Sequence, residues 1–297
     1  MTVDKIGDLT ATRVHNPEAV AAAAAARRPA ASPLGGSGDT TGRAMIIAAD
    51  HPARGANAVG ADAHAMADRG LLLERLCLAL ERPGVTGVLA TADILEDLLL
   101  LGVLDGKSVF GSMNRGGLAG SAFEIDDRFT GYDAETIAAM GFDGGKMLTR
   151  IALGDPATAA TLEAGARAVD ALADRRLIAM VEPFLSHWQD GRVRNDLSPD
   201  AVVTSVSIAS GLGRRSAYTW LKLPVVPDME RVVAATTLPV LLLGGDAGGA
   251  DSQRAVFDAW RGALRLPGVQ GLVVGRSLLY PADGDVGGAV DRAVGLL

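Results

Sequence analysis

The chain has 297 residues, of which 48% are hydrophobic, and its formal net charge is −7. This length and apolar fraction suit one large α/β domain or two small ones and exclude wholesale disorder, while the acidic balance argues against a general binder of nucleic acid or anionic membranes. The single cysteine, Cys77, excludes an internal disulfide, and the absence of a membrane-spanning stretch or secretion signal in the sequence predicts a soluble cytoplasmic protein.

The first 42 residues differ from the rest of the chain. An alanine run follows Asn16 and Pro17, so residues 16–28 are predicted to form a helix, and the Pro/Gly/Ser/Thr-rich residues 29–42 are predicted to form a loop. We therefore expect an N-terminal helical extension over 1–42 and a single domain over 43–297.

From residue 43 onward, short apolar runs alternate with longer amphipathic stretches. Eight strands are expected, at 44–50, 86–91, 107–113, 144–151, 176–184, 217–226, 238–245 and 269–275. Helices are expected at 62–82, 92–102, 133–140, 155–175, 198–211, 228–236, 251–265 and 286–296. Eight such units in about 250 residues predict an α/β fold of the (β/α)8 TIM barrel type. A doubly wound open sheet is the alternative, but its glycine-rich fingerprint after the first strand is missing.

Lysine is rare in this sequence. The chain has 28 basic residues, and the lysines among them are Lys5, Lys107, Lys146 and Lys222. Arginine stays protonated, whereas a buried lysine can lose its proton and act as a nucleophile. Lys146 and Lys222 lie inside the apolar fourth and sixth expected strands, while Lys107 opens the third strand, at the end of a barrel where chemistry does not occur.

Barrel enzymes place their chemistry at the carboxyl ends of the strands. There, Asp50 ends the first expected strand and Glu182 lies on the fifth, so both can meet the two lysines. An internal ion-pair network is one interpretation of these four residues. The chemical interpretation is an amine nucleophile that forms an iminium with a carbonyl substrate. We predict that Lys222, in the more apolar setting, is the nucleophile, that Lys146 is the neighbouring cation, and that Asp50 and Glu182 move protons.

Glycines after the last two expected strands predict a phosphate site. Gly244 and Gly245 follow the seventh strand, and Gly275 and Arg276 follow the eighth. Backbone N–H groups at such positions form the usual phosphate seat of a barrel, and arginine adds a bidentate donor, although many glycine-rich loops are simple turns.

Three further residues are candidates for the mouth of the barrel. Ser112 and His187 follow the third and fifth expected strands, and Arg150 shares strand parity with Lys146. The four histidines have no metal-site spacing, so no metal is expected.

The four charged strand residues, together with AADHPARG, VEPF, SAYTWLKLPVV and LLLGGD, resemble the class I (Schiff-base) aldolases from about residue 45 to residue 280. Within them, the sequence is most similar to the tagatose-bisphosphate-aldolase-like and deoxyribose-phosphate-aldolase-like groups and to a branch associated with inositol catabolism. The resemblance implies a metal-independent lyase without a cofactor, in which Lys222 forms the Schiff base and Lys146, Asp50 and Glu182 assist.

The resemblance also implies a small phosphorylated carbonyl substrate. One such substrate is 5-dehydro-2-deoxy-6-phosphogluconate, which would be cleaved to dihydroxyacetone phosphate and malonate semialdehyde. The sequence departs from tagatose-bisphosphate aldolases over residues 112–132 and in the segment HWQDGRVRND, where selectivity would be decided.

Two other functions are compatible with the same residues. One is a barrel isomerase or synthase that acts on a sugar phosphate without covalent catalysis. The other is a non-catalytic barrel that binds phosphorylated metabolites. Neither a nucleic acid nor a membrane is an expected partner, and self-association into a homo-oligomer is left open.

Overall fold

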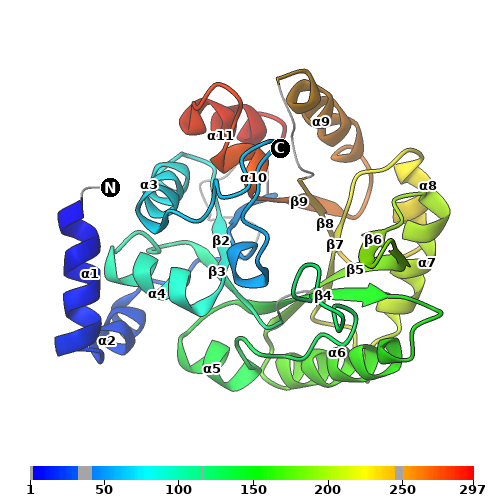
Figure 1. The fold of residues 1–297 in the computed structure, drawn as a ribbon, viewed down its shortest axis with the longest axis horizontal. Coiled ribbons are helices and arrows are strands. Elements are labelled where there is room, and N and C mark those ends of the chain that lie inside the picture. Colours follow the sequence, from blue (N-terminus) through cyan, green and yellow to red (C-terminus); the bar gives the residue numbers. More distant parts are fainter. Residues whose placement is uncertain (1–2, 33–41, 115–116, 245–249) are drawn as a thin grey trace.

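The computed structural model describes residues 3–32, 42–114, 117–244 and 250–297. Within these ranges eight parallel strands close into a barrel surrounded by helices (Figure 1). The barrel strands are β1 (Ala44–Ala48), β2 (Gly87–Ala90), β3 (Ser108–Ser112), β4 (Gly144–Ile151), β5 (Ile178–Gln189), β7 (Thr219–Leu223), β8 (Val240–Leu243) and β9 (Val269–Val274). Pairing of β1 with β9 and of β4 with β5 completes the ring, which confirms the predicted (β/α)8 TIM barrel.

Helices follow the strands in the order that the sequence predicts, with one short unpredicted helix, α10 (Arg276–Leu279), after the last strand. They are α3 (Arg69–Leu80), α4 (Ala92–Leu100), α5 (Ala134–Ala139), α6 (Ala157–Asp174), α7 (Pro199–Ser210), α8 (Met229–Ala234), α9 (Ala250–Ala263), α10 (Arg276–Leu279) and α11 (Val286–Val294). The helix expected at 62–82 begins later than predicted, at Arg69. Asp68 caps α3 by accepting a hydrogen bond of 2.9 Å from the backbone N–H of Leu71, and the residues before it form turns.

Among the described residues before the barrel, two helices occur, α1 (Val3–His15) and α2 (Ala19–Ala26), and the sequence predicts only the second. They pack at one side of the barrel, beside α4 (Figure 1). Arg13 on α1 donates hydrogen bonds of 2.8 Å to Glu96 and to Asp97 on α4. Arg27, after α2, donates to the backbone carbonyl oxygens of Lys107 (2.8 Å) and Gly141. The division between residues 42 and 43 stays a prediction.

Strand parity decides which side chains enter the barrel. One buried cluster fills its interior and includes Ile46, Phe110, Met180 and Leu241, whereas alternate residues such as Leu221 pack outward against the helices. On β4, β5 and β7 the even-numbered side chains therefore point inward. Polar residues at even positions near the carboxyl ends of these strands must lie above the apolar interior.

The carboxyl end of β5 extends beyond the barrel. It forms an antiparallel hairpin with β6 (Arg192–Asn195), which the sequence does not predict as a strand. Asp190 and Gly191 between the strands have φ of 50° and 70°, the left-handed values that a two-residue type I′ turn requires.

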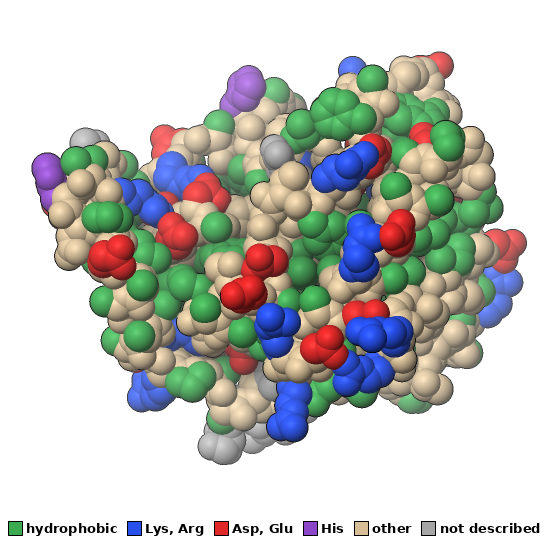
Figure 2. All heavy atoms as spheres, turned by 90° about the horizontal axis from the view of Figure 1, so that it is seen from below, with side chains coloured by type: hydrophobic (Ala, Val, Ile, Leu, Met, Phe, Trp, Pro, Cys, Tyr) green, Lys and Arg blue, Asp and Glu red, His purple; other side chains and the backbone are tan. Residues whose placement is uncertain are grey.

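Acidic and basic side chains are interspersed over the face of the molecule shown in Figure 2. Within the described ranges, no helix combines the length and apolar character needed to cross a bilayer.

Candidate active site

Four charged side chains meet at the carboxyl end of the barrel interior. Lys146 Nζ lies 2.8 Å from Asp50 Oδ2 and 2.6 Å from Glu182 Oε2. Lys222 Nζ lies 3.1 Å from Glu182 Oε1. The two lysines come from β4 and β7, the strands that flank β5, so Glu182 on β5 reaches both of them. The structure thus brings together the four residues that the sequence singles out.

The cluster is almost closed to solvent, so its charges interact strongly. Lys146 and Lys222 are each 3% exposed, Glu182 is 6% exposed and Asp50 is 9% exposed. Unpaired charges at this depth would be very unfavourable, and each of the four is within ion-pair distance of an opposite partner. The four charges therefore depend on one another: within the cluster, Asp50 has Lys146 as its only cationic partner, and Lys222 has Glu182 as its only carboxylate partner at ion-pair distance.

The surroundings of the two lysines shift their pKa values in opposite directions. Burial opposes the charge of Lys146, but Asp50 and Glu182 together hold its pKa above the ordinary lysine value. Burial lowers the pKa of Lys222, and the charge of Lys146 lowers it further, which outweighs the attraction of Glu182. Lys146 is thus fixed as a cation, while Lys222 is the amine that loses its proton more readily.

The carboxyl groups are ionised. Burial alone would raise the pKa of Glu182, but the charges of Lys146 and Lys222 hold it at about 2. Burial likewise opposes ionisation of Asp50, and Lys146 is the main group that keeps its pKa well below the ordinary value. His51 Nδ1 lies 3.6 Å from Asp50 Oδ1, and burial lowers the pKa of His51 to about 3, so its ring is neutral.

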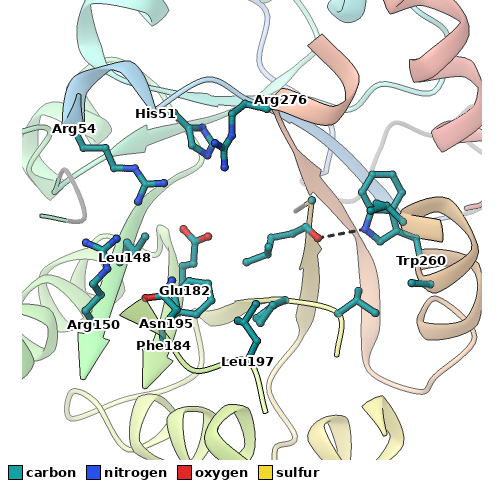
Figure 3. A pocket seen from close by; sticks show the side chains of 16 residues that line it. His51, Arg54, Leu148, Arg150, Glu182, Phe184, Asn195, Leu197, Trp260 and Arg276 are labelled. Atoms are coloured by element: carbon teal, nitrogen blue, oxygen red, sulfur yellow. Dashed lines mark hydrogen bonds between the residues drawn. The ribbon is translucent and has the colours of Figure 1, made fainter. Parts of the chain in front are cut away.

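A cavity of about 340 Å³ opens above this cluster, and Glu182 lies at its wall (Figure 3). His51, Arg276, Phe184 and Trp260 also line it, and the side chain of Trp260 donates a hydrogen bond of 3.3 Å to the carbonyl oxygen of Leu243. The volume is in the range that small-molecule sites occupy. Lys222 does not line the cavity, but its amine lies 3.1 Å from the carboxylate of Glu182, which does.

The residues predicted to hold phosphate lie beside the same cavity. Gly244 and Arg276 line it, and Gly275 immediately precedes α10. A Cβ at Gly275 would lie 2.3 Å from the carbonyl oxygen of Ala48, so the close approach of β1 and β9 requires glycine here. Gly245 lies outside the described residues.

Comparison with known proteins assigns the chain to a family. The model of a family described as Cgl0159-like matches residues 42–294, most of the chain. The chain belongs to this family. The crystal structure of Cgl0159 from Corynebacterium glutamicum is 54% identical, with a TM-score of 0.94, and the match covers 100% of this chain and 97% of that one.

More distant solved structures share the fold of this Cgl0159-like protein. A Schiff-base-forming fructose-1,6-bisphosphate aldolase is 20% identical with a TM-score of 0.61, and the match covers 86% of this chain and 94% of that one. An archaeal fructose 1,6-bisphosphate aldolase is also 20% identical, with a TM-score of 0.59 and coverage of 85% and 94%. At this identity the likeness establishes the barrel fold alone. No curated protein sequence matches the chain significantly.

The structure places the two predicted mouth residues Ser112 and His187 of this Cgl0159-like barrel in different surroundings. Ser112 is 3% exposed, pairs in register with Lys146, and donates a hydrogen bond of 2.9 Å to the carbonyl oxygen of Asn114. His187 is exposed on the hairpin, opposite Arg194, and does not line the cavity. Its odd position on β5 points it away from the side that carries Glu182, so the structure lends no support to its predicted binding role.

Two arginines also line the cavity. Arg150 reaches it, as its shared strand parity with Lys146 predicts. The sequence does not single out Arg54, although its place just after the first strand is a signal for a residue at the barrel mouth. The loop residue Glu124, which pairs with Arg150 at 2.8 Å, carries no such signal.

Metal ligation has no obvious site in the part of the chain that the structure describes. No group of three or more His, Cys, Asp and Glu side chains there is arranged to hold a metal ion. The expectation of metal-independent chemistry stays a prediction.

Proposed function

We propose that this protein is a class I aldolase, a carbon–carbon lyase that reversibly cleaves a phosphorylated keto compound through a Schiff base on Lys222 and needs no metal or cofactor. One observation carries the proposal: of two equally buried lysines that share Glu182, Lys146 contacts two carboxylates at 2.8 and 2.6 Å, whereas Lys222 contacts Glu182 alone at 3.1 Å and is the one whose pKa is lowered. A nucleophilic amine must be neutral, and burial beside a second cation is a known way to achieve this.

The first half of the reaction builds the iminium. The neutral amine of Lys222 attacks the substrate carbonyl carbon, and the carbonyl oxygen takes up a proton to give a carbinolamine. Loss of water then leaves a C=N⁺ bond. Glu182, 3.1 Å from Lys222 and at the cavity wall, is placed to accept the amine proton and return it to the departing hydroxyl group.

The second half breaks the carbon–carbon bond. A carboxylate accepts the proton of the substrate hydroxyl group two carbons from the iminium carbon, the aldehyde departs, and the bonding electrons move to nitrogen as an enamine. Protonation of the enamine carbon and addition of water release the ketone and restore Lys222. Lys146 keeps its charge throughout and holds Asp50 and Glu182 in place.

The phosphate end of the substrate is proposed to lie at Gly244, Gly275 and Arg276. The proposal requires the ketone to reach Lys222, whose amine lies 3.1 Å from the cavity-lining Glu182. Two distant relatives by fold support the chemistry: one is described as a Schiff-base-forming aldolase, and another was captured with its catalytic lysine bound to a carbinolamine intermediate. The finer proposal for the substrate is 5-dehydro-2-deoxy-6-phosphogluconate, in keeping with the branch associated with inositol catabolism.

Borohydride trapping tests the proposal. Dihydroxyacetone phosphate is incubated with the protein, the iminium is reduced, and the adduct is located by peptide mass spectrometry. We expect a stable adduct on Lys222, and Lys222→Arg should abolish it and lower cleavage on the order of 10⁵-fold, as removal of a covalent nucleophile does elsewhere.

Lys107→Arg is the matched control for this test. Lys107 also has its pKa lowered by burial, but its amine donates a 2.7 Å hydrogen bond to the carbonyl oxygen of Val85 at the opposite end of the barrel. This variant should keep the adduct. Normal turnover by Lys222→Arg, or an adduct on another lysine, would refute the assignment.

A barrel isomerase without covalent catalysis is the second candidate, because Glu182 lines the cavity while both lysines lie outside its lining. Such an enzyme would use the carboxylate as a base. It predicts solvent hydrogen exchange at a substrate carbon with no trapped adduct at any pH.

A further inference from the structure

Two arginines converge at the cavity on the side away from Trp260 (Figure 3). Arg54 ends a short 3-10 helix after β1 (Pro52–Arg54), and Arg150 projects inward from β4 above Lys146. In Figure 3 their guanidinium groups point toward one another. Both side chains also line a second hollow of about 560 Å³, which lies beside the β5–β6 hairpin. The pair therefore stands between the inner cavity and an outer opening.

The protein supplies carboxylates to one member of this pair, since Glu124, Asp127 and Glu182 all attract Arg150. Arg150, with 11% of its side chain exposed, pairs with Glu124 at 2.8 Å. Burial lowers the pKa of Arg150, and the charge of Arg54 lowers it further, so the two cations repel one another. Among the described residues, no carboxylate lies within ion-pair distance of the Arg54 guanidinium. Like charges held together at a cavity wall are stabilised when an anion binds between them.

The carboxylate that supports Arg150 is itself fixed. Glu124 is 4% exposed, and its Oε2 accepts a hydrogen bond of 2.9 Å from the backbone N–H of Gly120. The same loop is tied to Arg54, because the backbone N–H of Ala119 donates a 3.0 Å hydrogen bond to the Arg54 carbonyl oxygen. The loop thus contacts the Arg150 guanidinium through Glu124 and the Arg54 backbone through Ala119, so it fixes the positions from which both side chains reach the cavity.

We propose that Arg54 and Arg150 form a second anion subsite, which binds an anionic group, carboxylate or phosphate, on the aldehyde half of the substrate. This inference rests on the proposed aldolase function and adds a requirement to it. With Arg276 and the glycines at the other end, the preferred substrate carries a negative charge on both sides of the bond that breaks. A planar guanidinium fork suits either anion, so the pair selects for charge at this end.

The test uses the reaction in the direction of bond formation. Dihydroxyacetone phosphate is combined with one of three aldehydes: uncharged glyceraldehyde, malonate semialdehyde with its carboxylate, or glyceraldehyde 3-phosphate. We expect the wild-type protein to show a higher kcat/KM for at least one charged aldehyde than for glyceraldehyde. The relative rates with the two charged aldehydes show whether the natural group is a carboxylate or a phosphate.

Variants then assign the preference to the two arginines. Arg54→Gln and Arg150→Gln should each lower kcat/KM for the charged aldehyde on the order of 10- to 100-fold, the range for losing a charge-assisted hydrogen bond, and should leave glyceraldehyde nearly unchanged. Arg54 is partly exposed, so its variant should fold even where Arg150→Gln does not. Arg128→Gln removes an exposed arginine paired with Asp126 in the same loop region, and serves as the matched control with no change expected.

Borohydride trapping of dihydroxyacetone phosphate alone separates this proposal from the proposed function. That ketone does not need the second subsite, so Arg54→Gln should trap it on Lys222 as the wild type does. If the wild type traps no adduct, the aldolase function fails. If it traps the adduct but uses charged and uncharged aldehydes equally, or if Arg54→Gln slows all aldehydes alike, the second anion subsite is wrong.

Discussion

Lys146 and Lys222 enter the barrel from the two strands that flank β5, yet their surroundings move their pKa values in opposite directions. Each is 3% exposed, so burial does not distinguish them. Lys146 lies between two carboxylates, while Lys222 shares a single one with Lys146. The number of carboxylate partners thus decides which amine has the lower pKa, and the lysine with fewer partners is the one suited to attack a carbonyl.

The largest expected contrast between the two lysines is in stability. Lys146→Met leaves Asp50 and Glu182 buried with little compensation, so we expect a loss of about 3–5 kcal/mol in the free energy of unfolding. Lys222→Met leaves Glu182 paired with Lys146 and replaces an amine whose pKa is lowered with an apolar chain of similar length. Its cost should stay within about 1 kcal/mol.

Urea-induced unfolding of the two variants at neutral pH measures this difference. Equal losses would mean that the carboxylates do not discriminate between the two amines. A larger loss for Lys222→Met would reverse the assignment of the fixed cation.

A second contrast lies in the pH dependence of adduct formation. Lys222 must lose its proton to react, so the rate of trapping rises with pH and levels off above its pKa, which lies below the ordinary lysine value. The charge of Glu182 raises that pKa, so Glu182→Gln should move the midpoint to lower pH while slowing the maximal rate. Asp50 acts in the same direction more weakly, so Asp50→Asn should give a smaller shift.

Rates of borohydride trapping between pH 5 and pH 10 provide the measurement. The ordering of the two shifts is the critical result. A midpoint that moves to higher pH in Glu182→Gln would contradict the electrostatic account of Lys222.

The smallest expected effect concerns Ser112, which adjoins Lys146 in register but carries no charge. Ser112→Ala removes its 2.9 Å hydrogen bond to the Asn114 carbonyl oxygen and should cost about 1 kcal/mol in stability. The pH midpoint of trapping at Lys222 should not move, because no charge near that amine changes. A shift in the midpoint would show that the hydroxyl group acts on the lysine pair.

The sequence predicts the barrel because its strands are short, apolar and bounded by turns. It also predicts the inward lysines, since the outward-packing Leu221 and Leu223 bracket Lys222 on β7. It does not predict that Lys146 pairs with Asp50, 96 residues earlier, because that contact depends on closure of the ring. The functional roles of these residues stay predictions.

Two further features, helix α1 and the hairpin at the end of β5, are not predicted from the sequence, and the reasons are local. Helix α1 has no strong starting signal in the sequence, and contacts such as Arg13 with α4 support it from outside. The hairpin at the end of β5 did have a signal, the Asp190-Gly191 pair, which favours a tight turn. Recognising that hairpin would have shown that His187 sits on an extended strand, with its orientation set by parity.

The shared carboxylate of Glu182 has a consequence for the order of chemical events. Two carboxylates face two amines, so the buried cluster is electrically neutral only when both nitrogens are positive. A neutral Lys222 leaves the cluster with an excess negative charge, and an iminium on the same nitrogen removes that excess. The resting protein would therefore resemble the covalent intermediate more than it resembles its own reactive form, with the proton of Lys222 holding the place that the substrate carbon later takes.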